Sequence, residues 1–172
     1  MATLHHNISG ELTQELLAPG SGLKVSKISL TNTQKVSTCK VDLFIKKALK
    51  GKFYLIKGVE LPIGATLIYD DITFSNATGE YGLYIKLTNG PTFTLTGSID
   101  VTGTNLNVPG TNTLFTSELS IGDEVVISGE TRTIATITSR TVATVTAAFG
   151  SDLANDTTPD CNPTALVDVI IN

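Results

Sequence analysis

Apolar and polar residues alternate along much of the chain with a period of two. The clearest case is the segment STCKVDLFIKKAL, from residue 37 to residue 49. One face of this segment would carry Cys39, Val41, Leu43 and Ile45, and the other Lys40, Asp42, Phe44 and Lys46. A period of two is expected when one face of a β-strand is buried and the other is exposed. The segment is therefore predicted to be a half-buried strand.

Similar runs recur at short spacing over the first half of the chain. They are LKVSKISLTN with a break near Ser26, FYLIKGVELP after a turn at Lys50–Lys52, IGATLIYDDITF, and GLYIKLT. The run at Glu11–Leu17 fits either a helix or an edge strand. Threonine occurs 27 times, often beside Val, Ile or Leu, and alternating β-branched residues favour strands over helices. The pattern predicts an all-β protein whose first part is an antiparallel β-sandwich of the immunoglobulin-like or jelly-roll-like kind.

From about Thr92 the sequence becomes poorer in charge and richer in Thr, Gly, Asn and Val. Within this part, Thr133–Thr138 (TIATIT) is echoed by Thr141–Thr146 (TVATVT), which predicts a hairpin connected by Ser139 and Arg140. A polar linker, residues 150–164, leads to the alternating run ALVDVIIN, which needs a sheet partner because an isolated strand is unstable.

The simplest arrangement places this last run in the first module. The second module is then an insertion between GLYIKLT and ALVDVII, taken as two strands of one sheet. The predicted domains are residues 1–93 plus 159–172 for the β-sandwich, and residues 94–158 for a small β-barrel-like module inserted before the last strand.

Composition and charge narrow the function classes. The net charge of −4 and the pI near 5.1 argue against nucleic-acid binding, which needs clustered Lys and Arg. The one basic run, IKKALKGKFYLIKG, is interpreted as a solvated strand face and turn, with a patch for an acidic partner as the second interpretation. No run approaches the roughly 18 apolar residues of a membrane span, and no secretory signal is recognisable. We therefore expect folding in a cytoplasm, with Cys39 and Cys161 as reduced, separately packed thiols and a disulfide as the alternative.

Few residues suggest metal binding. His5 and His6 are interpreted as an exposed pair near a terminus, because no converging ligands can be named. Asp70 and Asp71 are adjacent, so on a strand they point to opposite faces and cannot share an ion without a bulge. A second candidate calcium group is Asp152, Asn155 and Asp156. Structural or surface roles are favoured for all of these residues, and no metal or cofactor is expected.

Four carboxylates could be mistaken for the paired acids of a glycosidase, whose carboxyl groups stand about 5–10 Å apart across the sugar. They are Glu118, Asp123, Glu124 and Glu130. A carbohydrate cleft usually offers aromatic platforms as well, and these are scarce in this region. The favoured interpretation is that Gly122-Asp123 and Gly129-Glu130 form turns between strands. We expect no catalytic residue and no enzymatic activity.

The segment from Val101 to Phe149 contains a dense motif of apolar, Gly and charged positions. They include Val108, Gly110, Thr111, Phe115, Glu118, Leu119, Gly122, Asp123, Val125, Ile127, Gly129, Glu130, Arg132, Ile134, Ile137, Ser139 and Thr141. With these positions the segment resembles a small β module that recurs in structural proteins of tailed bacteriophages. It departs from that module by an extra residue at Asn112–Leu114 and by Ala143 in place of a more familiar Leu.

The resemblance implies roles for these positions. Phe115, Leu119, Val125 and Ile127 would be core residues, and Gly122, Asp123, Gly129 and Glu130 would shape turns. Arg132 would pair with Glu118 or Glu130. The first module, through SKISLTNT and LPIGATL, is more loosely similar to a β-sandwich of virion proteins, particularly of phages that infect cyanobacteria.

A chain with both modules would be a non-enzymatic virion protein that acts through protein–protein contacts. The expected role is capsid decoration or cement, in the virion, after folding in the host cytoplasm. The expected partners are the major capsid or tail protein and other copies of the chain, with no nucleic acid and no membrane. The alternatives are a neck, tail or baseplate component, or an adhesin that binds a host-surface glycan through Tyr81 and Tyr84.

Overall fold

The structure is a computed structural model that describes residues 3–47, 50–77 and 79–172. In these residues it contains eighteen β-strands and one four-residue helix, which confirms the all-β class. The chain divides into two compact units. We call residues 1–34, 38–89 and 165–172 the sandwich unit, and residues 35–37 and 90–164 the small unit.

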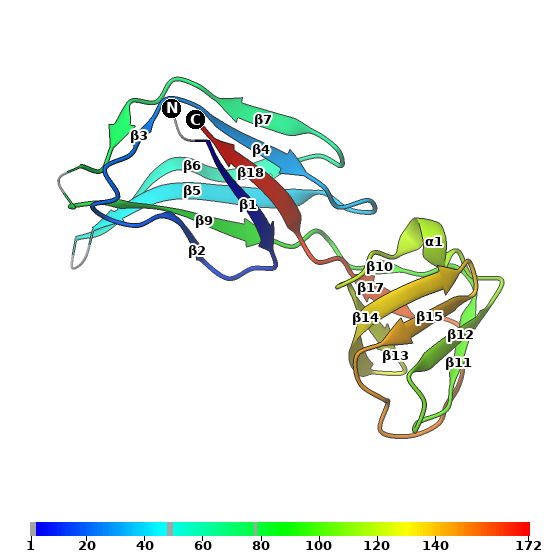
Figure 1. Cartoon of the computed structure of the whole chain (residues 1–172). Coiled ribbons are helices and arrows are strands. Elements are labelled where there is room, and N and C mark those ends of the chain that lie inside the picture. The colour runs from blue at the N-terminus through cyan, green and yellow to red at the C-terminus, as the bar shows by residue number, and fades with distance from the viewer. Residues whose placement is uncertain (1–2, 48–49, 78) are drawn as a thin grey trace. The chain divides into compact units, whose positions relative to one another are not determined.

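The sandwich unit contains two four-stranded antiparallel sheets (Figure 1). The first has the order β1 (Leu4–Ser9), β18 (Leu166–Ile171), β4 (Ile28–Asn32) and β7 (Thr66–Tyr69). The second has the order β2 (Gln14–Leu17), β9 (Gly82–Thr88), β5 (Cys39–Lys47) and β6 (Gly51–Leu61). Two short strands, β3 (Lys24–Val25) and β8 (Phe74–Ser75), pair separately. The inward-facing residues of the two sheets form one aliphatic core, so the predicted sandwich is confirmed.

Local sequence patterns explain most of these strands. In β5 the predicted inward residues Cys39, Val41 and Leu43 are fully buried. The run at Glu11–Leu17 contains an edge strand, β2, and no helix. The predicted break near Ser26 separates β3 from β4. Strand β5 follows the period of two up to Leu43 because one face of its sheet covers the core. Strand β2 departs from it, since Leu16 and Leu17 are both buried where the register with β9 shifts.

The prediction that β9 and β18 belong to one sheet is wrong. β18 lies between β1 and β4 in the first sheet, whereas β9 lies between β2 and β5 in the second. Both strands do belong to the sandwich unit, so the small unit is inserted between them as expected. Alternation tells which face of a strand is buried but not which neighbours the strand takes, because both sheets bury the same kind of face.

The small unit contains one series of eight antiparallel strands around its own core. Strands β10 and β16 at its two ends are not hydrogen-bonded neighbours, so the strands do not close into a barrel. Helix α1 (Phe115–Glu118) joins β12 to β13. The strand order is β10 (Phe93–Thr94), β17 (Asp160–Asn162), β13 (Glu124–Ile127), β14 (Glu130–Ser139), β15 (Val142–Val145), β12 (Asn107–Thr111), β11 (Ser98–Val101) and β16 (Leu153–Asp156).

The boundaries between the units differ slightly from the predicted ones at 93/94 and 158/159. Strand β10 pairs with β17, with Phe93 opposite Cys161, and both strands belong to the small unit. The boundaries therefore fall at residues 89/90 and 164/165. The predicted polar linker, residues 150–164, contains strands β16 and β17 of the small unit, which composition alone did not reveal.

Two hairpins in the small unit use different turns. Ser128 and Gly129 connect β13 to β14 with positive φ angles of 48° and 86°, as a two-residue type I′ hairpin requires. The echoed segments pair as β14 and β15, which confirms the predicted hairpin, although its connector is Arg140–Thr141. That connector contains no Gly, and backbone bonds from Phe115 N to Arg140 O (3.0 Å) and from Gly110 N to Thr141 O (2.8 Å) hold it.

Candidate functional site

The carboxylates of the small unit bind backbone amides of its own loops. Asp123 is fully buried, and its Oδ2 accepts a hydrogen bond from Ser120 N (2.7 Å) while its Oδ1 accepts one from Thr164 N (2.9 Å). Glu118 accepts bonds from the amide and the hydroxyl of Thr96. These two carboxylates therefore anchor different parts of the chain and do not face a common cleft.

Glu130 has a similar role. Its Oε2 accepts hydrogen bonds from Gly150 N and from Arg132 Nη2, each at 2.8 Å. Of the two partners predicted for Arg132, Glu118 and Glu130, the structure therefore shows Glu130. Arg132 also donates to Ala148 O at 2.7 Å and lies 5.0 Å from the centre of the Phe149 ring. The arginine thus ties β14 to the segment that follows β15.

Positions that the resemblance assigned to the core are buried: Phe115, Leu119, Val125 and Ile127. The turn assignment is also confirmed at Gly122 and Gly129, whose φ angles are 92° and 86°. Of the four candidate acids, Glu124 alone is classed as exposed, and it lies on β13 opposite Thr133 and Asn162.

The candidate calcium groups are engaged elsewhere or dispersed. Asp152 accepts a bond from Gly103 N (2.8 Å), and Asp156 accepts bonds from Ser128 N and Thr158 N. Asp70 and Asp71 are exposed residues that follow β7. In the part of the chain that the structure describes, no three His, Cys, Asp or Glu side chains gather as a metal site would need.

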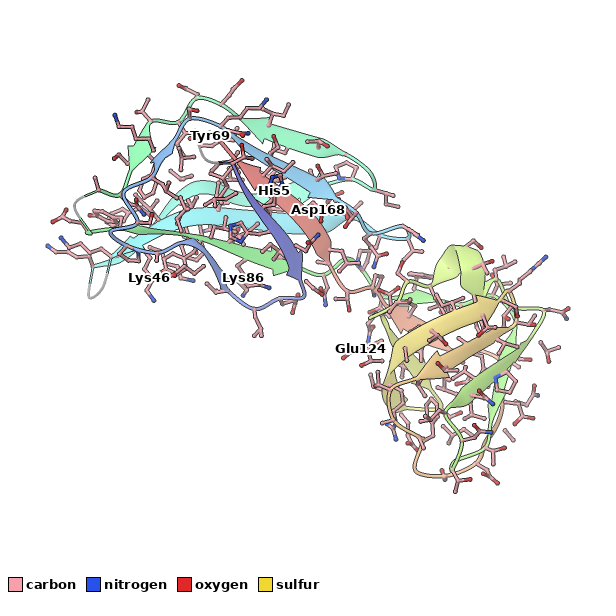
Figure 2. The ribbon with its side chains drawn as sticks, viewed as in Figure 1. His5, Lys46, Tyr69, Lys86, Glu124 and Asp168 are labelled. Atoms are coloured by element: carbon pink, nitrogen blue, oxygen red, sulfur yellow. The ribbon has the colours of Figure 1, made fainter. Side chains whose placement is uncertain are left out.

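The two histidines lie on opposite faces of β1. His5 is exposed as predicted, but His6 is half-buried and shares the inward face with Leu4 and Ile8. The Nε2 atom of His6 is buried, with no hydrogen-bond partner among the described residues. A hollow of about 230 Å³ is lined by both histidines together with Asp168, which is labelled with His5 in Figure 2. The Asp168 carboxylate accepts a hydrogen bond from the Asn7 amide.

The two thiols are unpaired and buried, one in each unit, which confirms separately packed cysteines. Burial raises the pKa of Cys39 from 9.0 to about 11. Burial raises the pKa of Cys161 further, and the neighbouring Asp123 carboxylate, 3.9 Å from the sulfur, adds to this. Raised thiol pKa values mean little thiolate at neutral pH, so neither cysteine is suited to be a nucleophile.

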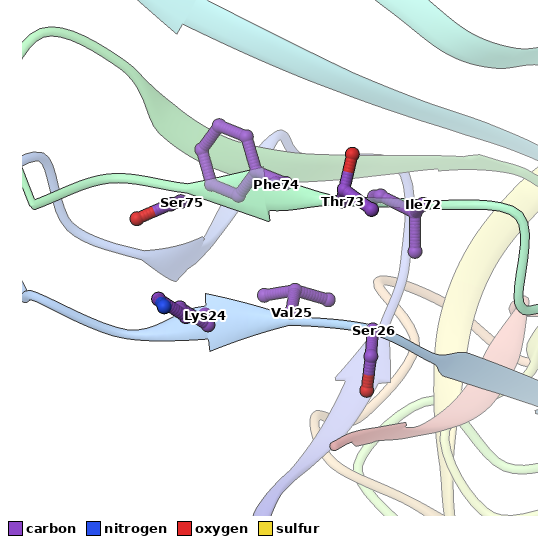
Figure 3. A pocket seen from close by; sticks show the side chains of 7 residues that line it. All are labelled: Lys24, Val25, Ser26, Ile72, Thr73, Phe74 and Ser75. Atoms are coloured by element: carbon purple, nitrogen blue, oxygen red, sulfur yellow. The ribbon is translucent and has the colours of Figure 1, made fainter.

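An apolar groove of about 360 Å³ lies beside the β3–β8 pair (Figure 3). One wall is Lys24, Val25 and Ser26, and the other is the segment 72–75, which includes Ile72 and Phe74. Lys24 is the single ionisable side chain among the lining residues, so the groove holds no acid–base pair for chemistry.

The most distinctive polar surface is the outer face of the second sheet of the sandwich unit. We call it the lysine–aromatic face. Its centre is a row of three rings: Phe44 lies 5.5 Å from Tyr54 and 5.9 Å from Tyr84, with the rings of Phe44 and Tyr84 nearly parallel. Five lysines are on this outer face, namely Lys40, Lys46, Lys52, Lys57 and Lys86. Figure 2 labels Lys46 and Lys86.

Two of these lysines lie over the rings. Lys52 Nζ is 4.4 Å from the centre of the Phe44 ring, and Lys57 Nζ is 5.0 Å from that of Tyr54. At exposed sites such a cation–π contact contributes about 0.5–1 kcal/mol, which favours this position of the ammonium group. Tyr84 donates a hydrogen bond to Glu15 at 2.8 Å, and this bond raises the pKa of Tyr84.

The sequence showed that Phe44 shares a strand face with lysines, but not that this face has an aromatic layer. Phe44 is fully buried because Tyr54 on β6 and Tyr84 on β9 flank it. The signal available was an aromatic residue at an outward position in each of three strands. The register of β5 and β6 shifts twice between Val41 and Phe44, so single-strand patterns could not align these rings.

Comparison with known proteins adds no relative: no family model matches the chain, and no curated protein or solved structure matches it significantly. Within the described residues, no helix has the length and apolar character to cross a bilayer.

Proposed function

We propose that this chain is a non-enzymatic structural protein of a tailed-phage virion, and that it decorates the capsid. The observation that supports the proposal is that the carboxylates of the motif bind the protein's own backbone. Asp123, Glu118 and Glu130 all accept hydrogen bonds from backbone amides of their own unit. The motif that resembles a virion module is thus a scaffold for loops.

Chemistry at these acids is disfavoured for a physical reason. A general acid or base has to come within hydrogen-bond reach of a substrate proton. Asp123 is fully buried and both of its oxygens already accept backbone N–H groups, so a substrate would have to displace structural bonds. Losing such a bond costs about 1–3 kcal/mol for each group left unsatisfied.

A decoration protein works by surface complementarity. Two compact β units, each with its own aliphatic core, offer rigid surfaces to neighbours. The long edge strand β6 exposes Phe53, Tyr54 and Val59, which gives a neighbour apolar surface to cover. The partners we propose are the major capsid or tail protein and other copies of the chain.

The test is the copy number of the protein in purified particles of the phage that encodes it, measured by quantitative mass spectrometry against a labelled standard. Hundreds of copies, spread over the capsid in electron micrographs of tagged particles, are expected for a decoration protein. A handful of copies at one vertex or along the tail would reassign it to the neck, tail or baseplate. No copies in washed particles would overturn the virion role.

A further inference from the structure

The lysine–aromatic face has uncompensated positive charge at the end of the β5–β6 hairpin where Lys46 faces Lys52. Lys46 and Lys52 are direct cross-strand partners, and both point outward. Like charges directly opposite each other destabilise a sheet pair. Lys47 is paired with Glu80 at 2.8 Å, whereas Lys46 faces Gly82 on its other side. A negatively charged partner would relieve this repulsion.

Carboxylates do occur on the same face, but towards its other parts. Asp42 accepts a hydrogen bond from Gly58 N (2.7 Å), and Glu15 accepts one from Tyr84. Glu60 is the cross-strand partner of Lys40, at the far end of the hairpin. The carboxylates therefore compensate the charge of the lysines near Lys40 and leave the end with Lys46 and Lys52 positively charged.

The rings of Phe44 and Tyr54 bind lysine ammonium groups, so they are poorly placed to stack against a sugar. Sugar stacking needs a bare ring, but Phe44 is fully buried and Lys52 Nζ stands 4.4 Å above it. Lys57 occupies the same kind of position over Tyr54. Ammonium groups that lie over rings, as those of Lys52 and Lys57 do, fit an acidic surface better than they fit a neutral glycan.

The chain itself has a surface of that kind. The sandwich unit has nine lysines and eight carboxylates, whereas the small unit has three basic side chains and eight carboxylates. On strand β13 the outward-facing Glu124 and Val126 lie beside Asn162 and Asp160 of β17. Threonines of the neighbouring β14 strand, Thr131 and Thr133, extend this surface without adding a positive charge. We call it the Glu124 face.

We propose that the lysine–aromatic face of one copy binds the Glu124 face of a second copy. The two surfaces belong to different units, so the contact is heterologous, and such contacts build rings or open arrays. Pairing two lysine–aromatic faces would bring like charges together. Pairing through the β6 edge is also disfavoured, because Lys52, Lys57 and the irregularity before Gly58 are features that protect edges. The inference rests on the proposal that copies of the chain are partners and specifies their contact; its test uses the purified chain, so it can fail while the virion role stands.

The first experiment measures self-association of the full chain by sedimentation velocity at low and high salt. We expect concentration-dependent association that weakens by about tenfold or more when salt is raised from 50 to 500 mM, as screening of a charged contact requires. The double variant Lys46→Glu/Lys57→Glu should remain monomeric. Lys46→Glu creates an opposite-charge pair with Lys52, so this half of the double variant does not weaken the fold.

A matched control changes the net charge by the same amount elsewhere. Lys24→Glu/Lys27→Glu alters lysines on and after β3, away from the lysine–aromatic face, and should associate as the natural chain does. Loss of association in this control would attribute the effect to net charge and would overturn the proposed surface.

The decisive experiment mixes two variants that cannot associate alone. Glu124→Lys abolishes the acidic surface and leaves the lysine–aromatic face intact, while Lys46→Glu/Lys57→Glu does the reverse. Neither mutant should associate by itself, because each lacks one half of the contact. Mixing them brings one natural lysine–aromatic face together with one natural Glu124 face, so we expect the mixture to associate although neither variant associates alone. Asp100→Lys, on β11, is the control for Glu124→Lys and should associate normally.

A chain that stays monomeric at every salt and protein concentration overturns this inference, and it leaves the virion copy number untouched. The same holds if the lysine–aromatic face binds a polyanion such as dextran sulfate but no second copy, which would assign the surface to an acidic glycan. Dimers that persist in both charge-reversal variants would place the interface elsewhere.

Discussion

The fully buried side chains that anchor loops differ in chemistry between the sandwich unit and the small unit. In the sandwich unit these anchors are side-chain amides. The Asn32 amide donates to Leu61 O and accepts from Gln34 N, and the Asn76 amide donates to Ala18 O and accepts from Leu23 N. In the small unit the carboxylate of Asp123 accepts backbone N–H groups. An amide can donate and accept, so it can join carbonyls to amides, whereas a carboxylate can only accept.

This difference explains why the small unit looked like a place for catalysis. Each carboxylate that satisfies backbone N–H groups adds negative charge without adding reactivity. The small unit consequently has many more carboxylates than basic side chains, although most of the acids named above are bound to its own backbone. A regular spacing of acids in a threonine-rich β module is therefore weak evidence for chemistry.

Exchanging the two kinds of anchor should damage both units, and the sandwich unit more. Asn76→Asp removes the donor to Ala18 O and places a charge in a site that is 1% exposed. We expect a loss of about 3–5 kcal/mol in the unfolding free energy of the sandwich unit, as for an unpaired buried charge. All four tyrosines lie in this unit, so tyrosine fluorescence during urea unfolding reports it selectively. Asn76→Ala is the control: equal damage from both would show that the charge itself costs nothing.

The reverse exchange, Asp123→Asn, keeps the shape but replaces one acceptor oxygen by an N–H donor. Both Asp123 oxygens accept backbone N–H groups, so an amide can satisfy only one of them. We expect the small unit to lose about 1–3 kcal/mol, the cost of an unsatisfied buried group.

Hydrogen exchange read by mass spectrometry should show faster exchange in residues 90–164 of this variant, while the tyrosine signal of the sandwich unit keeps its midpoint. Full protection of Ser120 and Thr164 amides in the variant would contradict the anchoring role of Asp123.

The sequence predicted the class of the fold better than its connections. Burial of Val41 and Leu43 followed from alternation, because a sheet that covers a core leaves one face dry. The sheet that β18 joins did not follow, since both sheets present the same kind of inner face. The environment of Phe44 could not be predicted either, because it depends on Tyr54 and Tyr84 from two other strands.

The candidate surfaces were predicted only in part. The basic run near Lys46 was recognised as a strand face with a second interpretation as an acidic-partner patch. Its opposition to Lys52 depends on the register of β5 and β6, which irregularities alter. The roles of Asp123 and Glu130 as turn-shaping residues followed from the adjacent glycines and again from the resemblance, and the structure adds which amides they bind.

The two thiols should make both units lose stability at alkaline pH. Burial raises the pKa of Cys39 from 9.0 to about 11, so the folded state holds this proton more tightly than the unfolded state does. The stabilisation is complete below pH 9 and is lost as pH rises from 9 towards 11, by about 1.4 kcal/mol per pH unit. For Cys161 the loss should continue to higher pH, because its pKa is raised further.

The measurement is urea unfolding at pH 7.5 and pH 10.5 for the natural chain and for Cys39→Ala and Cys161→Ala. Each variant is compared with itself at neutral pH, so the cost of the small cavity cancels. We expect each alanine to remove about 1–2 kcal/mol of the alkaline loss, and only in its own unit. An unchanged pH dependence in both variants would assign the loss to tyrosines or lysines.

The smallest expected effect is at Lys46, and it connects the stability of the sandwich unit with the surface it presents. Lys46→Gln removes the repulsion from Lys52 without adding a charge, so we expect the isolated chain to gain about 0.3–0.5 kcal/mol, the size of a cross-strand charge effect. The gain should shrink at high salt, because screening weakens the repulsion that the substitution removes.

Lys40→Gln is the matched control, since Lys40 faces Glu60 and its loss should slightly destabilise the unit. The measurement is the change in unfolding free energy of each variant, followed by tyrosine fluorescence. Opposite signs of this change would show that uncompensated positive charge lies at one end of the hairpin only. Equal signs would contradict the assigned register. A residue that lowers the stability of its own unit is expected where a partner supplies the compensating charge, and for that reason Lys46→Gln should stabilise the monomer while it weakens association with a second copy.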